Sequence, residues 1–153
     1  PGQDTLITIR LRPLAVALDT VVVAAERSRR LVREGFYDRR AKRIGVFRTP
    51  EELEAQNPLF VDDLFWGMGI LIRQSRGRPI PSRNRVVSPS NPSCSLTVAL
   101  DGFVITEAWT ELVHAQDVEA VEVYTSPAGV PVWLQGIVSS CGAVVLWTKG
   151  SRD

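Results

Sequence analysis

The sequence predicts an α+β domain in which short helices accompany a mixed or antiparallel sheet. Apolar runs of strand length recur from the N-terminal part of the chain to its C-terminal part. Helix-capping patterns occur between the early runs and the late ones. Asp101-Gly102, a sequence favoured in tight β-hairpin turns, separates two of the later runs.

Size and composition agree with one globular domain. The chain has 153 residues, of which 44% are hydrophobic, and its formal net charge is +1. The longest uncharged stretch, residues 123–148, contains Pro127, Pro131 and several glycines, so it predicts turns and short strands rather than a membrane-spanning helix. Because the chain begins at Pro1 rather than at a methionine, we expect that a leader was removed or that the chain is a piece of a longer protein.

The N-terminal segment, residues 1–25, is expected to contain two strands. Ile7, Ile9 and Leu11 alternate with polar residues, which is the period of a half-buried strand over residues 5–12. A run of valines farther along predicts a second, more buried strand. The remainder of the chain, up to residue 153, is treated as the main domain.

The next pattern is helical. Leu31 and Phe36 supply an apolar side, whereas Arg39 and Arg40 are expected on a strongly basic outer side. Gly35 is expected to weaken this helix or to end it.

A capping box predicts a further short helix. Thr49 offers an N-cap hydroxyl, Pro50 suits the first helical position and Glu52 stands at the third, so the helix should end at residue 55 or 56. Asn57-Pro58 then repeats this pattern of an N-cap residue followed by a proline.

A second short helix should begin at this Asn57-Pro58 pair. It is expected to end near Gly67, and residues 69–73 then predict a strand.

Residues 74–93 predict a long loop rich in Arg, Ser, Pro and Asn. A loop of this length is unusual in a compact domain and is either a binding element or a mobile insertion. The candidate partner-binding residues are the arginines on and beside this loop, the two helical arginines and one tryptophan: Arg73, Arg76, Arg78, Arg83, Arg85, Arg39, Arg40 and Trp133.

The second half of the chain carries the remaining strands. Residues 96–100 and 103–105 should pair around the Asp-Gly turn. A helical turn over residues 107–115 should lead to a strand over residues 118–124, and residues 143–147 predict the last strand.

Charge is unevenly distributed along the chain. Residues 26–48 hold nine basic residues against three acidic ones, and residues 73–85 hold five basic residues and no acidic one. The second half is mainly acidic, so we expect a basic face and an acidic face. Such faces either orient the protein on a charged partner or are solvated and pair with each other.

The four tryptophans are expected mostly in the core. Trp133 lies between turns, and it is equally compatible with a core position and with an exposed anchor for a partner or for lipid head groups.

The two cysteines, Cys94 and Cys141, each precede a predicted strand. They are compatible with a disulfide that closes a loop of about 48 residues, and also with two buried free thiols. A disulfide would place the protein outside the cytosol.

No catalytic centre, metal site or cofactor is predicted. His114 is the only histidine, which excludes a histidine cluster, and we expect it at the surface or at a helix end. Asp62 and Asp63 are adjacent and point in different directions, which favours capping or solvation over a metal site. The Gly-Met-Gly sequence at residues 67–69 lacks the third glycine of a dinucleotide fingerprint. The arginines come without a helix-turn-helix or zinc pattern, so nucleic-acid binding is not expected.

Several of these motifs resemble one family. The sequence ALDTVVV followed by AAER, at residues 17–27, resembles the segment through which TonB-dependent outer-membrane receptors pass from a carboxypeptidase-regulatory-like module into the plug domain. TPEEL at residues 49–53 and DDLF at residues 62–65 resemble the two short helices that precede the first core strand of the plug.

The second half carries three more matches to the plug. LDG at residues 100–102 resembles its central hairpin, and VEAVEVY at residues 118–124, with the Pro-Ala that follows, resembles its recurrent D-V-E-x-I-E-V strand and turn. CGAVVLWTK at residues 141–149 resembles the final strand, in a cysteine-containing version whose partner thiol precedes the hairpin.

The resemblance covers residues 14–149 and implies an α+β plug fold, a periplasmic location in a Gram-negative-type cell, no enzymatic activity and no cofactor. It also favours the disulfide between Cys94 and Cys141. The sequence departs from the family because no barrel follows Asp153, so the gating of a pore does not carry over. Residues 74–93 lie where plugs carry variable, substrate-facing loops.

Two functions remain as alternatives. The first is a non-enzymatic interaction module, a structural or accessory subunit that docks on the periplasmic face of a membrane protein complex, for example a photosynthetic or respiratory assembly, with contact to anionic lipid head groups. The second is a plug or stand-alone plug-like component of TonB-dependent outer-membrane transport, whose partner is an outer-membrane barrel. We expect the first, because the chain has plug length and ends in the charged residues 149–153.

Overall fold

The computed structural model of the chain describes residue 2 and residues 28–73, 85–106 and 109–150. The described residues form a five-stranded mixed sheet, a three-stranded antiparallel sheet and several short helices, which confirms the predicted α+β class. The strands predicted within residues 1–25 lie outside the described residues. Within the described part, no helix has the length and the apolar character needed to cross a membrane.

Short helices and short strands alternate along the described part of the chain. The helices are α1 (Arg29–Arg33), α2 (Phe36–Ala41), α3 (Pro50–Gln56) and α4 (Trp109–Leu112), with 3-10 helices η1 (Val61–Phe65), η2 (Ala115–Asp117) and η3 (Val132–Leu134). The strands are β1 (Val46–Arg48), β2 (Leu71–Arg73), β3 (Arg85–Ser88), β4 (Asn91–Ser95), β5 (Thr97–Leu100), β6 (Phe103–Ile105), β7 (Val118–Tyr124) and β8 (Ala143–Thr148).

The large sheet has the strand order β1-β7-β8-β5-β6. Strands β5 and β8 are parallel, and the other neighbouring strands are antiparallel. Strand β8 lies at the centre of this sheet, and β7 and β8 are its most buried strands, because both of their faces are covered. The small sheet has the order β2-β3-β4.

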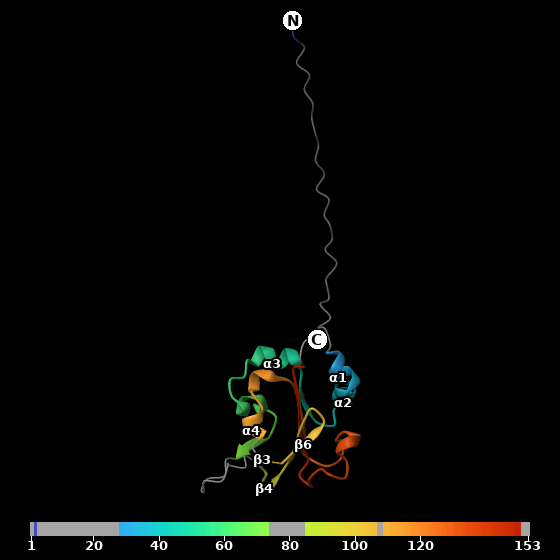
Figure 1. Cartoon of the computed structure of the whole chain (residues 1–153), viewed down its shortest axis with the longest axis vertical. Helices are drawn as coiled ribbons and strands as arrows, with labels where there is room; N and C mark the ends of the chain where they lie inside the picture. The colour runs from blue at the N-terminus through green and yellow to red at the C-terminus, as the bar shows by residue number, and fades with distance from the viewer. Residues whose placement is uncertain (1, 3–27, 74–84, 107–108, 151–153) are drawn as a thin grey trace.

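Two layers of helices cover the large sheet (Figure 1). Along β8, Val144 and Leu146 belong to one core and Val145 and Trp147 to the other, as the alternation of side chains along a strand requires. The first core is completed by α3, η1, α4 and the small sheet, through residues that include Leu53, Leu64, Trp109 and Val86. The second core is completed by α1, α2 and η3, through residues that include Leu31, Phe36 and Leu134.

The capping box predicted for α3 is present. The Thr49 hydroxyl accepts a hydrogen bond from the Glu52 backbone N–H at 3.3 Å, and the Glu52 carboxylate accepts one from the Thr49 N–H at 2.8 Å. The predicted end at residue 55 or 56 is also confirmed, because the helix ends at Gln56.

The helix predicted after residue 25 is divided in two at Gly35. This glycine has a φ of 72°, a left-handed conformation that interrupts a helix and that glycine adopts without steric cost. The expectation that Gly35 would weaken or end the helix is therefore confirmed.

The second capped helix begins later than the sequence predicts and is a 3-10 helix, η1. Its cap is Asp63, whose carboxylate accepts hydrogen bonds from the backbone N–H groups of Leu59, at 3.0 Å, and Phe60, at 2.8 Å. The Asn57-Pro58 pair therefore does not begin this helix. The capping role that the sequence favours for Asp63 is therefore present.

The loop predicted over residues 74–93 is partly wrong. Residues 85–88 and 91–95 form the hairpin β3–β4, and only residues 74–84 of the predicted loop lie outside the described residues. Val86 and Val87 are buried and favour a strand, whereas Pro89 lies in the two-residue turn of the hairpin. Pro92 is tolerated because β4 is an edge strand of the small sheet, where a missing N–H costs least.

The chain passes from the small sheet to the large one at Leu96. Its N–H donates to the Val86 carbonyl at 2.8 Å, and the next N–H, that of Thr97, donates to the Gly142 carbonyl at 2.9 Å. Cys94 and Cys141 form a disulfide beside this joint, with their Cα atoms 5.9 Å apart. The disulfide therefore fastens the small sheet to the turn that precedes β8.

Candidate interaction surfaces

The partner-binding residues predicted from the sequence lie in several separate places. Arg76, Arg78 and Arg83 lie outside the described residues. The others are found on the small sheet (Arg73 and Arg85), on α2 (Arg39 and Arg40) and in η3 (Trp133). These groups lie on separate elements and have different environments.

Arg39 is turned inward, which corrects the prediction that it lies on a basic outer side. Its side chain is only 17% exposed, and it forms a bidentate ion pair with the Glu122 carboxylate through Nε at 2.8 Å and Nη2 at 2.6 Å. Its Nη1 donates to the Glu34 carbonyl at 2.6 Å. Arg40, one residue later, is exposed and pairs with Glu52 at 3.3 Å.

Glu122 is a completely buried carboxylate on β7. Besides Arg39, it accepts hydrogen bonds from the Trp147 indole N–H, at 2.6 Å, and from the Tyr124 hydroxyl. Burial raises the pKa of Tyr124 first, and the charge of Glu122 raises it further. Burial tends to lower the pKa of Arg39, but the hydrogen bonds and charge of Glu122 outweigh this effect and leave that pKa raised.

The β7 strand is predicted from the sequence, but this network is not. The missed signal lies in the alternation of the strand, because Ala120, Glu122 and Tyr124 share one face while Val121 and Val123 share the other. A carboxylate on a face that helices cover must be paired, since an unpaired buried charge is very costly. The network therefore holds α2 on the large sheet.

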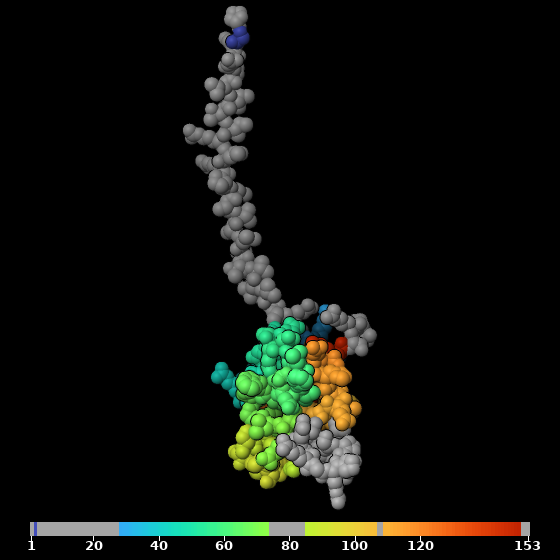
Figure 2. Space-filling model, turned by 90° about the vertical axis from the view of Figure 1, so that its left-hand side faces the viewer, coloured from blue at the N-terminus to red at the C-terminus, as the bar shows by residue number. Residues whose placement is uncertain are grey.

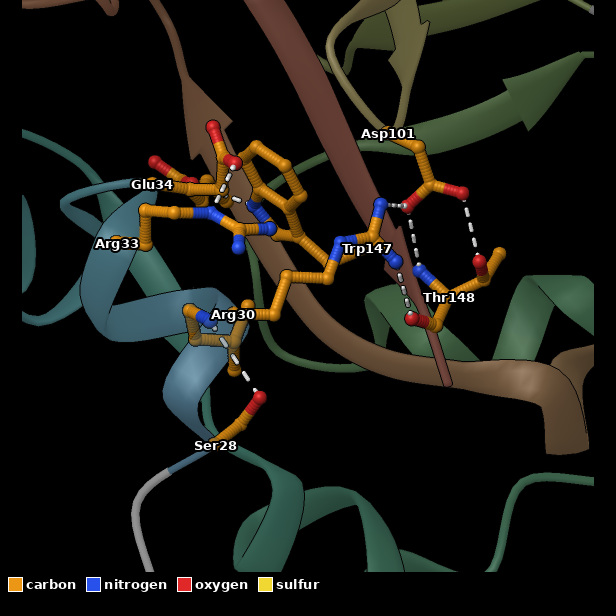
Figure 3. A network of polar contacts seen from close by, with 9 residues as sticks. Ser28, Arg30, Arg33, Glu34, Asp101, Trp147 and Thr148 are labelled. Carbon is orange, nitrogen blue, oxygen red and sulfur yellow. Dashed lines mark hydrogen bonds and ion pairs between the residues drawn. The ribbon is translucent and has the colours of Figure 1, made fainter. Parts of the chain in front are cut away.

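A second polar network fixes α1 at the end of β8 (Figure 3). The Arg30 guanidinium pairs with Asp101 at 2.7 Å, donates to the Thr148 carbonyl at 3.0 Å and lies 5.8 Å from the centre of the Trp147 ring. Asp101 also accepts from the Thr148 N–H, at 2.9 Å, and from its hydroxyl, at 2.6 Å. Asp101 therefore serves both the predicted hairpin turn and the docking of a helix.

The small sheet carries an exposed pair of arginines. Arg73 on β2 and Arg85 on β3 are directly opposite each other in the antiparallel register, and both are exposed. Arg85 lies across the hairpin, because its Nε donates to the Ser95 hydroxyl and its Nη2 to the Ser93 carbonyl at 2.9 Å. Leu71 lies on the same side of β2 as Arg73 and is also exposed.

We call Leu71, Arg73 and Arg85 the arginine face. Like charges that are directly opposite in a sheet repel each other. Among the described residues, no carboxylate forms an ion pair with either arginine, and residues 64–100 of the sequence contain no Asp or Glu. The arginine face thus has a positive charge that its own neighbours do not neutralise.

Figure 2 shows the side of the molecule on which the green segment with α3 and η1 lies beside the orange segment. Exposed aromatic side chains flank η1 in the sequence. Trp66 follows η1 and is 80% exposed, which corrects the expectation of a core position, and Phe60 precedes η1 and is 72% exposed. Trp109 and Trp147 are buried as expected, and Trp133 is 37% exposed. Trp66 escapes the core because the two residues before it, Leu64 and Phe65, already fill the apolar side of η1.

An open cleft of about 830 Å³ lies between α3, η2 and the end of β8. Leu53, Ala115 and Val118 line it from buried positions. Its polar lining includes three carboxylates and one ammonium group, those of Glu54, Asp117, Glu119 and Lys149. We call this feature the acidic cleft. No sequence pattern predicts this cleft, because α3 and η2 are far apart along the chain.

His114 is exposed and is the N-cap residue of η2, as expected for a residue at a helix end. Within the described ranges, no three residues of the types His, Cys, Asp and Glu are grouped so that they could hold a metal ion.

No protein-family model matches the chain, and no curated protein matches it either. The resemblance to the TonB-dependent plug domain therefore rests on the sequence motifs alone.

Proposed function

We propose that the chain is a non-enzymatic interaction module, a structural or accessory subunit that docks on the periplasmic face of a membrane protein complex. Its docking surface is the arginine face. The observation that carries this proposal is the cross-strand pair of Arg73 and Arg85, which has no neutralising carboxylate among the described residues.

The chemistry of this pair favours an acidic protein surface as partner. A guanidinium group can bind a carboxylate through two parallel hydrogen bonds, and such charge-assisted bonds are about twice as strong as neutral ones. A partner carboxylate between Arg73 and Arg85 would also relieve their mutual repulsion. Leu71 adds an apolar contact beside the charges, a combination that is common at protein interfaces.

The arginine face is held in place before any partner arrives. Arg85 is fixed by its two bonds to β4, and the disulfide fastens β4 to the large sheet. Groups that are already ordered lose less conformational entropy on binding. A partner would therefore meet one defined arrangement of positive charge.

The location in the periplasm is supported by the disulfide between Cys94 and Cys141, because such bonds persist in oxidising compartments. The resemblance of the hairpin and the β7 strand to a plug domain supports the same location.

The test is a gentle-detergent purification from the membranes of cells that make the protein, followed by mass spectrometry of the bound chains. Three forms are compared: the unmodified chain, the charge-reversed variant Arg73→Glu/Arg85→Glu, and the control Lys42→Glu/Arg43→Glu. The control changes the same number of charges at exposed positions on another part of the molecule.

We expect the unmodified chain and the control to be recovered in stoichiometric amount with an inner-membrane complex, and the variant at the arginine face to be lost from it. Retention of that variant would contradict the arginine face as docking surface. Recovery of the unmodified chain with an outer-membrane barrel would replace this function with TonB-dependent transport, and recovery with anionic lipid alone would contradict a protein partner.

A further inference from the structure

The longest uncharged stretch of the chain carries a group of exposed apolar side chains. Residues 123–148 contain no charged residue, and η3 lies within them. Val132 is 82% exposed, Ile137 is 60% exposed and Trp133 is 37% exposed. We call residues 130–138 the η3 loop. Single exposed apolar residues are common on protein surfaces, but three of them within six residues form a patch.

The η3 loop is held by the domain on one side and exposed on the other. Val130 and Leu134 are buried in the second core. Four N–H groups of the loop, those of Leu134, Gln135, Ile137 and Val138, donate to carbonyl groups of the same loop at 2.9 to 3.3 Å. A segment without charge, whose peptide groups are bonded to each other, loses little hydration energy when it enters an apolar medium.

Basic residues border this loop. Lys42 and Arg43 lie between α2 and β1 and are both exposed, and neither forms an ion pair among the described residues. Ile44 follows them and lies against Gly129, because a Cβ added to that glycine would overlap the Ile44 side chain. The pair of Lys42 and Arg43, which we call the basic turn, is therefore a neighbour of the η3 loop on the surface.

The helices beside the basic turn share its positive charge. Residues 29–43 hold seven basic residues against two acidic ones, Glu34 and Asp38. Three of the seven pair with carboxylates of other elements: Arg30 with Asp101, Arg39 with Glu122 and Arg40 with Glu52. Four basic residues then remain for the two acidic ones, so this layer keeps a positive charge that favours an anionic partner.

We propose that the η3 loop and the basic turn bind the surface of a lipid bilayer that contains anionic lipid. Val132 and Ile137 enter the interfacial region together with Trp133, a residue type that is enriched at that depth. Lys42 and Arg43 lie at the level of the anionic head groups, which attract basic residues close to the surface. A bilayer accounts for both features, because its charged surface covers an apolar layer.

This contact and the arginine face lie on opposite faces of the large sheet. The elements α1, α2 and η3 complete the second core, whereas the small sheet completes the first. Figure 1 shows α1 and α2 on one side of the large sheet and α3 and α4 on the other. Binding of a bilayer at the η3 loop therefore does not depend on the proposed docking function, and it leaves the arginine face open to a protein.

Co-sedimentation of the full-length chain with lipid vesicles tests the proposal. We expect the chain to sediment with vesicles of equal parts phosphatidylcholine and phosphatidylglycerol, and far less with vesicles of phosphatidylcholine alone. Added salt should weaken the binding, because it screens the attraction between the basic turn and the head groups. If the chain does not bind the anionic vesicles, the proposal is wrong.

Two pairs of substitutions separate the η3 loop from other exposed apolar residues. Val132→Asp/Ile137→Asp should lower the partition coefficient on anionic vesicles about tenfold or more, because carboxylates are costly in the apolar layer. The matched control Leu59→Asp/Leu112→Asp places the same charges at comparably exposed residues before η1 and in α4, and it should keep the binding. Thermal unfolding confirms that both variants are folded. Equal losses in the two pairs would show that added negative charge alone is the cause, and would overturn insertion of the η3 loop.

Charge reversals distinguish the bilayer contact from docking on a protein complex. Lys42→Glu/Arg43→Glu should lower binding to anionic vesicles about tenfold or more. The same variant should still be recovered with the complex in detergent, where the bilayer has been removed. Arg73→Glu/Arg85→Glu should keep most of its vesicle binding even though it loses the complex. If only the variant at the arginine face loses the vesicles, the lipid contact belongs to that face and not to the η3 loop.

Discussion

At the scale of single residues, Glu122 has the most demanding environment in the described chain. A buried carboxylate is tolerated only when its partners offset the loss of hydration, and Arg39, Tyr124 and Trp147 all donate to it. Removing the charge would leave the Arg39 guanidinium without its counter-ion in a mostly buried position. This arrangement makes Glu122 more sensitive to substitution than any exposed acid.

We expect Glu122→Gln to lower the free energy of unfolding by about 3–5 kcal/mol, the usual cost of breaking a buried ion pair from one side. Urea denaturation at pH 7 measures this change. Glu52→Gln is the control, because Glu52 pairs with Arg40 in a partly exposed position, although it also belongs to the capping box of α3 and should cost about 1 kcal/mol. Equal losses in the two variants would show that the buried network contributes nothing special.

The second prediction at this scale concerns Tyr124 and pH. Its raised pKa means that the folded state keeps the phenol protonated after the unfolded state, with a pKa of about 10, has begun to ionise. The stability that comes from this difference is complete below about pH 10 and is lost as the pH rises further, by up to about 1.4 kcal/mol per pH unit.

Tyr124→Phe removes this dependence, together with the hydrogen bond to Glu122. We therefore expect the unmodified chain to have a higher free energy of unfolding than the variant at pH 8, and we expect this difference to narrow above pH 10. Urea denaturation of both proteins from pH 8 to pH 11 measures the difference in free energy of unfolding. Two parallel curves over this range would show that Tyr124 ionises equally well in the folded state.

At the scale of the elements, the turn before β8 depends on Gly142. Its φ is 97°, and a Cβ added there would lie 1.9 Å from the Tyr124 carbonyl oxygen on the neighbouring strand. Gly136 has a similar φ of 86°, but a Cβ added to it would meet no atom within 4 Å. A comparison of alanine substitutions at the two glycines therefore separates the free-energy cost of the left-handed backbone from that of the close approach.

We expect Gly136→Ala to lower the free energy of unfolding by about 1–2 kcal/mol, which is the cost of the backbone conformation alone. Gly142→Ala should lower the free energy of unfolding by about 1–3 kcal/mol more than this, because the backbones of β7 and β8 must also move apart. Thermal or urea denaturation of the two variants measures the difference. Similar values for both would contradict a close approach at Gly142.

The same scale shows which parts of the structure could be predicted from the sequence. The α3 capping box, the Asp101-Gly102 turn and the β7 strand were predicted because their signals lie within a few neighbouring residues. The hairpin β3–β4 was missed because its prolines and serines resemble a loop, and only the burial of Val86 and Val87 reveals the strand.

The candidate surfaces needed contacts between distant segments. Arg39 faces inward because its partner, Glu122, lies 83 positions away, which no helical pattern can reveal. The sequence did identify Arg73 and Arg85 as candidates, but their direct opposition follows from the register of β2 and β3. The acidic cleft joins α3, η2 and the end of β8, so it exists only in the folded chain.

At the scale of the whole molecule, the disulfide is the covalent link between the two sheets. The backbone also joins the two sheets, at Leu96. The disulfide between Cys94 on β4 and Cys141 before β8 connects the small sheet, which carries the arginine face, to the central strands of the large sheet. A cross-link of this span stabilises a protein mainly by restricting the unfolded chain, typically by about 2–4 kcal/mol. Its loss should also loosen the small sheet more than the large one.

We therefore expect Cys94→Ser/Cys141→Ser to lower the free energy of unfolding by about 2–4 kcal/mol and to act unevenly on local order. Amide hydrogen exchange should accelerate most at the β2–β3–β4 sheet, whereas the β7–β8 amides, which lie between two covered faces, should keep their protection relative to global unfolding. The unmodified chain with its disulfide reduced is the control, because it loses the same bond without gaining serine hydroxyls. If the serine variant is destabilised and the reduced chain is not, the substitutions are the cause. If exchange accelerates evenly across both sheets, the small sheet is held by packing rather than by the disulfide, and the arginine face does not depend on the bond for its order.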